Sequence, residues 1–210
     1  MNTKNSVNLE YEILEAAREL FLERGFDNTS TTDIAKKVGC NQALVHYYFR
    51  TKENLFQRIF IQNIENLLSY AENFYYDGDF IALLENIIFS YFELLNANRR
   101  LPFFLIKEFA INEDRRIFFR KKFVHNERVR SLYYKLDSLV KAEVESGNIR
   151  PIETYDLLLD MLSLCAFTFI SLPMYTTWLE KGETEVDDFI EARKKEVLTM
   201  VINSLRKPIS

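Results

Sequence analysis

Apolar residues recur at intervals of three and four through most of the chain. Near the start, Ile13, Ala17 and Leu20 follow this spacing, which places them on one face of a helix. The same spacing predicts further helices, with glycines or prolines between several of them. The predicted helices span about 9–24, 30–38, 42–48, 52–76, 80–96, 101–111, 113–146, 152–172 and 186–206. The pattern therefore predicts an all-α protein of about nine helices.

Residues 77–79, Asp-Gly-Asp, interrupt the pattern after a long predicted connecting helix at 52–76. We predict an N-terminal helix-turn-helix domain at 1–55 and a helical effector-binding and dimerisation domain at 56–210. The 210 residues are 48% hydrophobic, enough for a sizeable core, and they include only 5 Gly and 4 Pro. So few turn residues argue against an all-β protein.

Several classes of protein are disfavoured by the same sequence. The two cysteines, Cys40 and Cys165, have no metal-ligand or disulfide spacing, and the only histidines are His46 and His125. No Ser/His/Asp arrangement or Gly-rich phosphate loop is present, so we predict no enzyme, no cofactor and no metal site. The polar start lacks a signal peptide, and polar residues interrupt the apolar stretch at 157–174. We expect a cytoplasmic protein without a membrane segment.

The predicted helices at 30–38 and 42–48 have the spacing of a helix-turn-helix, whose second helix enters the major groove of DNA. The net charge of the chain is -4, so any DNA contact must come from a local patch. Between Asp33 and Glu53 no acidic residue occurs, and this window contains Lys36, Lys37 and Arg50. A surface without carboxylates can approach phosphates without repulsion.

The second of these helices is rich in small and polar side chains. Gln42 can pair with adenine, and Ala43 can contact a thymine methyl group. Tyrosine hydroxyls and the ammonium of Lys52 suit phosphates better, so they would set register more than sequence preference.

The run at 34–49, IAKKVGCNQALVHYYF, with KENLF at 52–56 and AARELF at 16–21, closely resembles the DNA-binding signature of the TetR family. The resemblance covers about the first quarter of the chain. Tyrosine is frequent in the family where this chain has His46, and a small or hydroxyl residue where it has Leu44, so the operator sequence does not carry over. The DNA-binding positions implied by the resemblance are Ser30, Thr31, Thr32, Asn41, Gln42, Ala43, Leu44, His46, Tyr47, Tyr48 and Lys52.

The C-terminal part is rich in aromatic residues, most of which we assign to the core, and a cavity left among them would bind an apolar or aromatic effector. Candidate ligand-binding residues are Phe104, Glu108, His125, Phe167 and Trp178. The last two predicted helices resemble the dimerisation pair of the family, with more apolar surface than one inward face needs. Candidate dimer contacts are Leu158, Leu162, Cys165, Phe169, Val197 and Val201. The basic run at 115–122 is flanked by acids, so we interpret it as a solvated helix with ion pairs rather than a second nucleic-acid patch.

The resemblance implies a sequence-specific transcriptional regulator, a ligand-released repressor that binds a palindromic DNA operator as a homodimer. The alternative is a DNA-binding regulator without a small-molecule effector. In that case the C-terminal domain would serve only dimerisation or a protein partner.

Overall fold

The computed structural model describes residues 3–72, 78–180 and 182–207, and within these ranges it contains helices and no strand. The all-α prediction is confirmed. The helices are α1 (Thr3–Arg24), α2 (Thr31–Val38), α3 (Gln42–Phe49), α4 (Lys52–Glu72), α5 (Phe80–Ala97), α6 (Leu101–Ile111), α7 (Glu113–Phe119), the π-helix η1 (Arg120–Val124), α8 (Glu127–Glu145), α9 (Thr154–Leu179) and α10 (Glu183–Leu205). The predicted connecting helix reached Tyr76, and residues 73–77 lie outside the described part.

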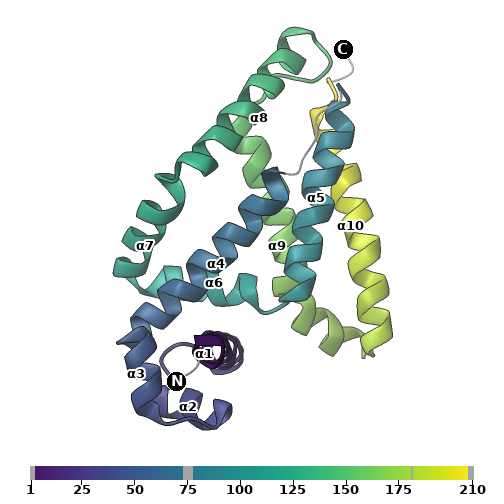
Figure 1. Ribbon diagram of the computed structural model, residues 1–210. Coiled ribbons are helices and arrows are strands. Elements are labelled where there is room, and N and C mark those ends of the chain that lie inside the picture. The colour runs from purple at the N-terminus through teal and green to yellow at the C-terminus, as the bar shows by residue number, and fades with distance from the viewer. Residues whose placement is uncertain (1–2, 73–77, 181, 208–210) are drawn as a thin grey trace.

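Figure 1 shows α1, α2 and α3 gathered at one end of the molecule, with α4 running from them into a larger helical unit. In that unit α5, α9 and α10 pack against one another, while α7 and α8 form an arm on the opposite side. Helix α6 crosses between the two units and contacts α7 and α9. The small unit therefore meets the large one through both α4 and α6.

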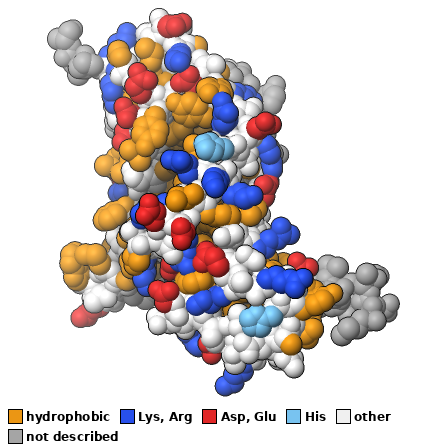
Figure 2. Space-filling view, turned by 90° about the vertical axis from the view of Figure 1, so that its left-hand side faces the viewer, with side chains coloured by type: hydrophobic (Ala, Val, Ile, Leu, Met, Phe, Trp, Pro, Cys, Tyr) orange, Lys and Arg blue, Asp and Glu red, His pale blue; other side chains and the backbone are white. Residues whose placement is uncertain are grey.

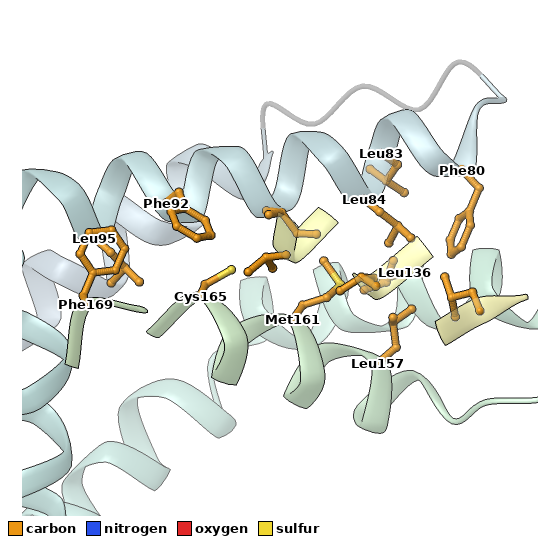
Figure 3. Close-up of a cluster of buried hydrophobic side chains, with 14 of the residues drawn as sticks. Phe80, Leu83, Leu84, Phe92, Leu95, Leu136, Leu157, Met161, Cys165 and Phe169 are labelled. Carbon is orange, nitrogen blue, oxygen red and sulfur yellow. The ribbon is translucent and has the colours of Figure 1, made fainter. Parts of the chain in front are cut away.

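Two main hydrophobic clusters hold the chain together. The first joins α1, α2, α3 and the start of α4, and Leu101 and Phe104 of α6 complete it. The second joins α5, α8, α9 and α10, and part of it is shown in Figure 3. The first cluster continues past the predicted domain boundary to Phe56 and Ile59. The division at residue 55 stays a prediction.

The structure corrects the single helix predicted at 113–146. The chain leaves the helix at Asn126, whose backbone is extended, with φ -74° and ψ 124°. The Asn126 side chain accepts hydrogen bonds from the backbone N–H groups of Arg128 and Val129 and so begins α8 as an N-cap. Apolar periodicity continues across this break, which is why spacing alone did not reveal it.

Helix α9 continues past Pro173, where the sequence predicted its end. Proline removes one backbone hydrogen bond, yet the helix reaches Leu179. The Thr177 hydroxyl donates to the Pro173 carbonyl at 2.7 Å, and the Tyr175 ring stacks on Phe189 of α10 at 3.8 Å between centroids. Tertiary packing against α10 thus offsets the proline.

The predicted dimer contacts are largely wrong, because four of them lie in the core of their own subunit. Cys165, Phe169, Val197 and Val201 are each at most 2% exposed. Figure 3 shows Cys165 and Phe169 on the side of α9 that faces α5. The other two, Leu158 and Leu162, line a cavity described below. Burial in the subunit core leaves none of the four free to meet a second chain.

By length and composition alone, α5 and residues 154–178 of α9 could each cross a membrane. Packed core helices can have the same length and composition, and both of these helices contribute to the second hydrophobic cluster. Only 33% of each apolar window is buried in the single chain. Apolar surface is therefore left over on these helices.

Candidate nucleic-acid interface

Side-chain caps fix the start of both short helices. At the start of α2, the Asp33 N–H donates to the Ser30 hydroxyl at 3.1 Å and the Ser30 N–H donates to the Asp33 carboxylate at 2.9 Å. The Ser30 hydroxyl also donates to this carboxylate, and the hydrogen bonds that the carboxylate accepts, from the Ser30 hydroxyl first and the Ser30 N–H second, lower the pKa of Asp33. Asn41 caps α3 by accepting from the Ala43 N–H at 2.9 Å. Between the helices Gly39 has φ 76°, a left-handed conformation that favours glycine.

The two helices bury one face and expose the other. Ile34 and Ala35 of α2 and Val45 and Phe49 of α3 pack into the first hydrophobic cluster. Of the predicted DNA-binding side chains, the exposed ones are Ser30, Thr32, Asn41, Gln42, Ala43, His46 and Tyr47, and the half-buried ones are Thr31, Leu44, Tyr48 and Lys52. The predicted positions therefore gather on one accessible surface, which is the geometry that groove binding requires.

Gln42, Thr31 and His46 form a polar cluster on this surface. The Gln42 amide nitrogen donates to the Thr31 hydroxyl at 2.9 Å and lies 3.4 Å from His46 Nε2. His46 Nδ1 lies 3.1 Å from the backbone carbonyl of Arg50. A carbonyl oxygen only accepts, so this contact requires a proton on Nδ1. The network therefore orients Gln42 and His46 before any DNA is bound.

Arg50 adopts a strained backbone conformation that the sequence did not reveal. Its φ is 65° and its ψ is -55°. The Thr51 N–H donates to the Phe49 carbonyl at 2.7 Å, which makes Arg50 the centre of a γ-turn with positive φ. Such a conformation costs a non-glycine residue about 1–3 kcal/mol. The turn directs the Arg50 carbonyl at His46 on the exposed face of α3.

Lys52 is held by the protein itself. Its ammonium donates to the Phe26 carbonyl at 2.8 Å and lies 4.1 Å from the centre of the Phe26 ring. The side chain thus joins the start of α4 to the turn between α1 and α2. An ammonium has three donors, so the predicted phosphate contact stays possible beside this internal one.

A buried arginine links the small unit to the large one. Arg115 of α7 is 3% exposed and forms an ion pair with Glu108 of α6, itself 5% exposed. Its guanidinium also lies 3.0 Å from a Glu53 carboxylate oxygen on α4 and 3.8 Å from the Phe26 ring centre. The interpretation of this arginine as part of a solvated helix is wrong, because its partners enclose it.

A cavity of about 700 Å³ opens between α4, α5, η1, α8 and α9. Its walls are mostly apolar, with a few polar and charged side chains among them. The described lining residues are Leu68, Leu83, Ile87, Ser90, Tyr91, Phe123, Val124, Val129, Arg130, Leu132, Tyr133, Tyr134, Lys135, Leu136, Leu139, Tyr155, Leu158, Leu159 and Leu162. A cavity of this size and character suits a small organic molecule.

None of the five predicted ligand-binding residues lines this cavity, and the structure does not bring them together. Phe104 packs in the first hydrophobic cluster, and Glu108 is paired with Arg115. His125 lies on the surface after η1. Phe167 and Trp178 point outward from α9, 64% and 75% exposed. Leu158 and Leu162, which we predicted as dimer contacts, line the cavity instead, because the side of an apolar helix that faces inward depends on its neighbours.

No described residues form a metal centre: groups of three or more His, Cys, Asp or Glu side chains placed to hold an ion are absent from them. The site is instead a capped pair of short helices with an exposed polar face, attached to a helical unit with an apolar cavity. These features define a helix-turn-helix protein whose second helical unit contains an apolar cavity.

Comparison with known proteins narrows this class. The family model of bacterial regulatory proteins, tetR family, matches residues 13–59. The HTH-type transcriptional regulator QacR of Staphylococcus aureus is 42% identical over 59 residues, 28% of this chain and 30% of QacR. IcaR of Staphylococcus epidermidis, the negative transcriptional regulator of the biofilm operon icaADBC, is 32% identical over 63 residues, 30% of this chain and 32% of IcaR. The chain thus matches less than a third of the length of these relatives.

The likeness in fold extends over nearly the whole chain. The TetR-family transcriptional regulator PfmR of Thermus thermophilus superposes with a TM-score of 0.66 at 20% identity, covering 89% of this chain and 97% of PfmR. Residues 13–59 therefore match the DNA-binding part of the tetR family, and the chain as a whole shares the fold of PfmR. The relatives matched over this region are named as transcriptional regulators.

Proposed function

We propose that this protein binds a palindromic DNA operator as a homodimer, represses transcription there and is released by a small molecule. The observation that carries the proposal is the exposed polar face of α3, on which Gln42 and His46 are already oriented by hydrogen bonds. Pre-ordered side chains lose less conformational freedom when they meet base edges. A cytoplasmic location, where the chromosome is accessible, is part of the proposal.

The outer face of α9 supports dimerisation. Phe167, Met174 and Trp178 follow one another at intervals of seven and four, and all are at least 51% exposed. Met200, on the neighbouring α10, is 44% exposed. Exposed apolar side chains concentrated on packed neighbouring helices are typical of an interface between identical subunits. These residues replace the buried set that the sequence indicated.

The cavity supports the effector role. It lies beside α4, the helix that leads to α3, and Leu68 of α4 belongs to its wall. The alternative of a C-terminal domain that serves only dimerisation or a protein partner gives no reason for an apolar cavity of about 700 Å³. We therefore favour the regulator with an effector.

Arg115 offers a route from the cavity to the DNA-binding unit. Phe123 and Val124 of η1 line the cavity, and α7, which carries Arg115, leads directly into η1. A ligand that displaces η1 would move Arg115 relative to Glu53 and Phe26. Such a ligand lowers operator affinity by its preference for the displaced state. Repression would therefore end when the ligand is present. Repression rather than activation is supported by the similarity to IcaR, which is named as a negative regulator.

The proposal is tested by selecting binding sites from a random duplex library with the purified full chain at a fixed salt concentration. We expect repeated recovery of a short palindrome. A folded protein that enriches no sequence would contradict the proposal. A selected site without two-fold symmetry would contradict the homodimeric part alone.

A further inference from the structure

We infer that the cavity between α4, α5, α8 and α9 binds a long-chain carboxylate, an amphiphile with an aliphatic tail and an anionic head group. The inference rests on the effector role proposed above and specifies the chemistry of that ligand. Three features of the cavity wall support it: its aliphatic surface, the sign of its charges and its phenol groups.

Aliphatic side chains form most of the wall. Leucines and isoleucine from four helices surround the space, and the tyrosines add further apolar ring surface. The aliphatic members include Leu68 of α4, Leu83 and Ile87 of α5, Leu132, Leu136 and Leu139 of α8, and Leu158, Leu159 and Leu162 of α9. A flexible aliphatic chain can fill such a space, and each methylene it buries strengthens binding about threefold to fourfold.

The charges on the wall are all positive. Arg130 and Lys135 of α8 line the cavity, and no carboxylate occurs among its described lining residues. Neither cation takes part in an ion pair with any residue that the structure describes. The guanidinium of Arg130 lies 6.0 Å from the Tyr134 ring centre, at the distance limit of a cation–π contact. Both cations can therefore pair with an anionic ligand, whereas a cationic ligand would find repulsion there.

Hydroxyl groups add neutral donors to the same wall. Tyr91 and Ser90 belong to α5, and Tyr133 and Tyr134 lie on α8. Burial raises the pKa of Tyr91 to about 12, so its phenol keeps its proton near neutral pH. A protonated phenol can donate a hydrogen bond to a carboxylate oxygen.

Figure 2 looks onto the α7–α8 side of the molecule. Hydrophobic side chains form an area in the upper half of this face, and side chains of both charges border it. The preference for an anionic head group therefore rests on Arg130 and Lys135, the charged residues that line the cavity itself.

The test compares three ligands with the same twelve-carbon tail: dodecanoate, dodecanol and dodecyltrimethylammonium, each below its micelle concentration. Isothermal titration calorimetry with the full chain gives the affinities. We expect dodecanoate to bind tightest and the ammonium weakest. We also expect dodecanoate affinity, but not dodecanol affinity, to fall as salt rises, because salt screens exposed charges.

Variants locate the site and the charge. The double variant Arg130→Gln with Lys135→Gln should weaken dodecanoate binding about fivefold and leave dodecanol within about twofold, as expected for partly exposed ion pairs. Lys195→Gln, on the exposed side of α10, is the matched control and should change neither. Leu162 lies on the cavity wall and is 39% exposed, so the larger side chain of Leu162→Trp can fill the cavity without disturbing the core. This variant should abolish the binding of both dodecanoate and dodecanol.

The outcomes separate the two claims. Tightest binding of the ammonium, or an unchanged dodecanoate affinity in the double variant, overturns the carboxylate inference and leaves the effector role intact. Dodecanoate binding that survives Leu162→Trp overturns the placement in this cavity. If none of the three ligands binds, the carboxylate inference is overturned, while the effector role is decided separately by whether any small molecule releases the protein from its selected DNA site. DNA binding, measured separately, is unaffected by any of these results.

Discussion

The guanidinium carbon of Arg115 lies 3.8 Å from the centre of the Phe26 ring, and this contact joins α7 to the turn between α1 and α2. On its other sides the same guanidinium meets carboxylates of Glu108 on α6 and Glu53 on α4. Four separate segments thus converge on one buried cation. A rearrangement of α6 or α7 would reach the DNA-binding unit through this group.

Arg115→Ala should destabilise the protein strongly. It leaves the buried carboxylate of Glu108 without its partner, and breaking a buried pair in this way costs about 3–5 kcal/mol. Thermal and urea unfolding measure the change. Arg116→Ala is the control, because Arg116 is exposed and, among the residues that the structure describes, donates to the carbonyls of Phe109 and Ala110 alone. Equal losses of unfolding free energy in the two variants would contradict a stabilising role of the Arg115–Glu108 ion pair.

Gln42→Ala should relax sequence preference in the library selection. Gln42 is exposed on α3, and a side chain that pairs with a base edge contributes about 1–3 kcal/mol of discrimination between base pairs. Unchanged preference in the Gln42 variant argues against its base-reading role.

Lys36→Ala should instead weaken binding to all duplexes. It should also reduce the slope of log affinity against log salt concentration by about 1, as expected for one lost phosphate contact.

Arg50→Gly should stabilise the protein by about 1 kcal/mol. The φ of 65° strains an arginine and suits a glycine, although glycine also gives the unfolded chain more freedom. The Arg50 carbonyl that accepts from His46 belongs to the backbone and remains. Arg50→Ala keeps the Cβ atom and should bring no gain in chemical denaturation. A glycine variant less stable than the original protein would contradict the claim that the Arg50 backbone is strained.

Cys165 should resist thiol reagents until the protein unfolds. Burial raises its pKa from the ordinary value of 9.0 to about 12, so the reactive thiolate is scarce at pH 8. The folded state favours the protonated Cys165 thiol. The stability that comes from this preference is present below about pH 9 and is lost as the pH rises towards 12. A colorimetric thiol assay on a Cys40→Ser variant, native and in urea, measures it. Fast reaction of the native variant would contradict the burial.

Phe167→Glu combined with Trp178→Glu should convert the proposed dimer to a monomer. Charges placed on the exposed apolar face of α9 would have to be buried without partners in a subunit interface. Light scattering after size-exclusion chromatography reports the mass. Ile111→Glu, at an exposed residue of α6, is the control and should stay dimeric. A dimeric double variant would place the interface elsewhere.

The helix-turn-helix could be predicted from sequence because its determinants are local. Ser30 and Asp33 cap α2 three residues apart, and Gly39 and Asn41 shape the turn that follows. The contacts of Arg115 could not be predicted in this way, because its partner Glu53 lies 62 residues away. Nothing in the spacing of the basic run marks one arginine as buried.

The residues that line the cavity could not be predicted from the sequence for a related reason. Helix α9 is apolar on several sides, so its composition does not say which side faces α5. Cys165 turned inward and Phe167 outward, although both are apolar and two residues apart. The break at Asn126 is different, because a capping signal was present in the sequence and the continuing periodicity obscured it.

The most direct test of the account uses the selected duplex and a derivative with about five base pairs inserted between its half-sites. Two α3 helices in a two-fold dimer must reach successive major grooves about 34–36 Å apart on one face of DNA. Half a turn of inserted duplex moves one half-site to the opposite face. We predict a loss of affinity of about a hundredfold or more, measured by fluorescence anisotropy. Equal affinity for both duplexes would contradict binding of a palindrome by a rigid homodimer.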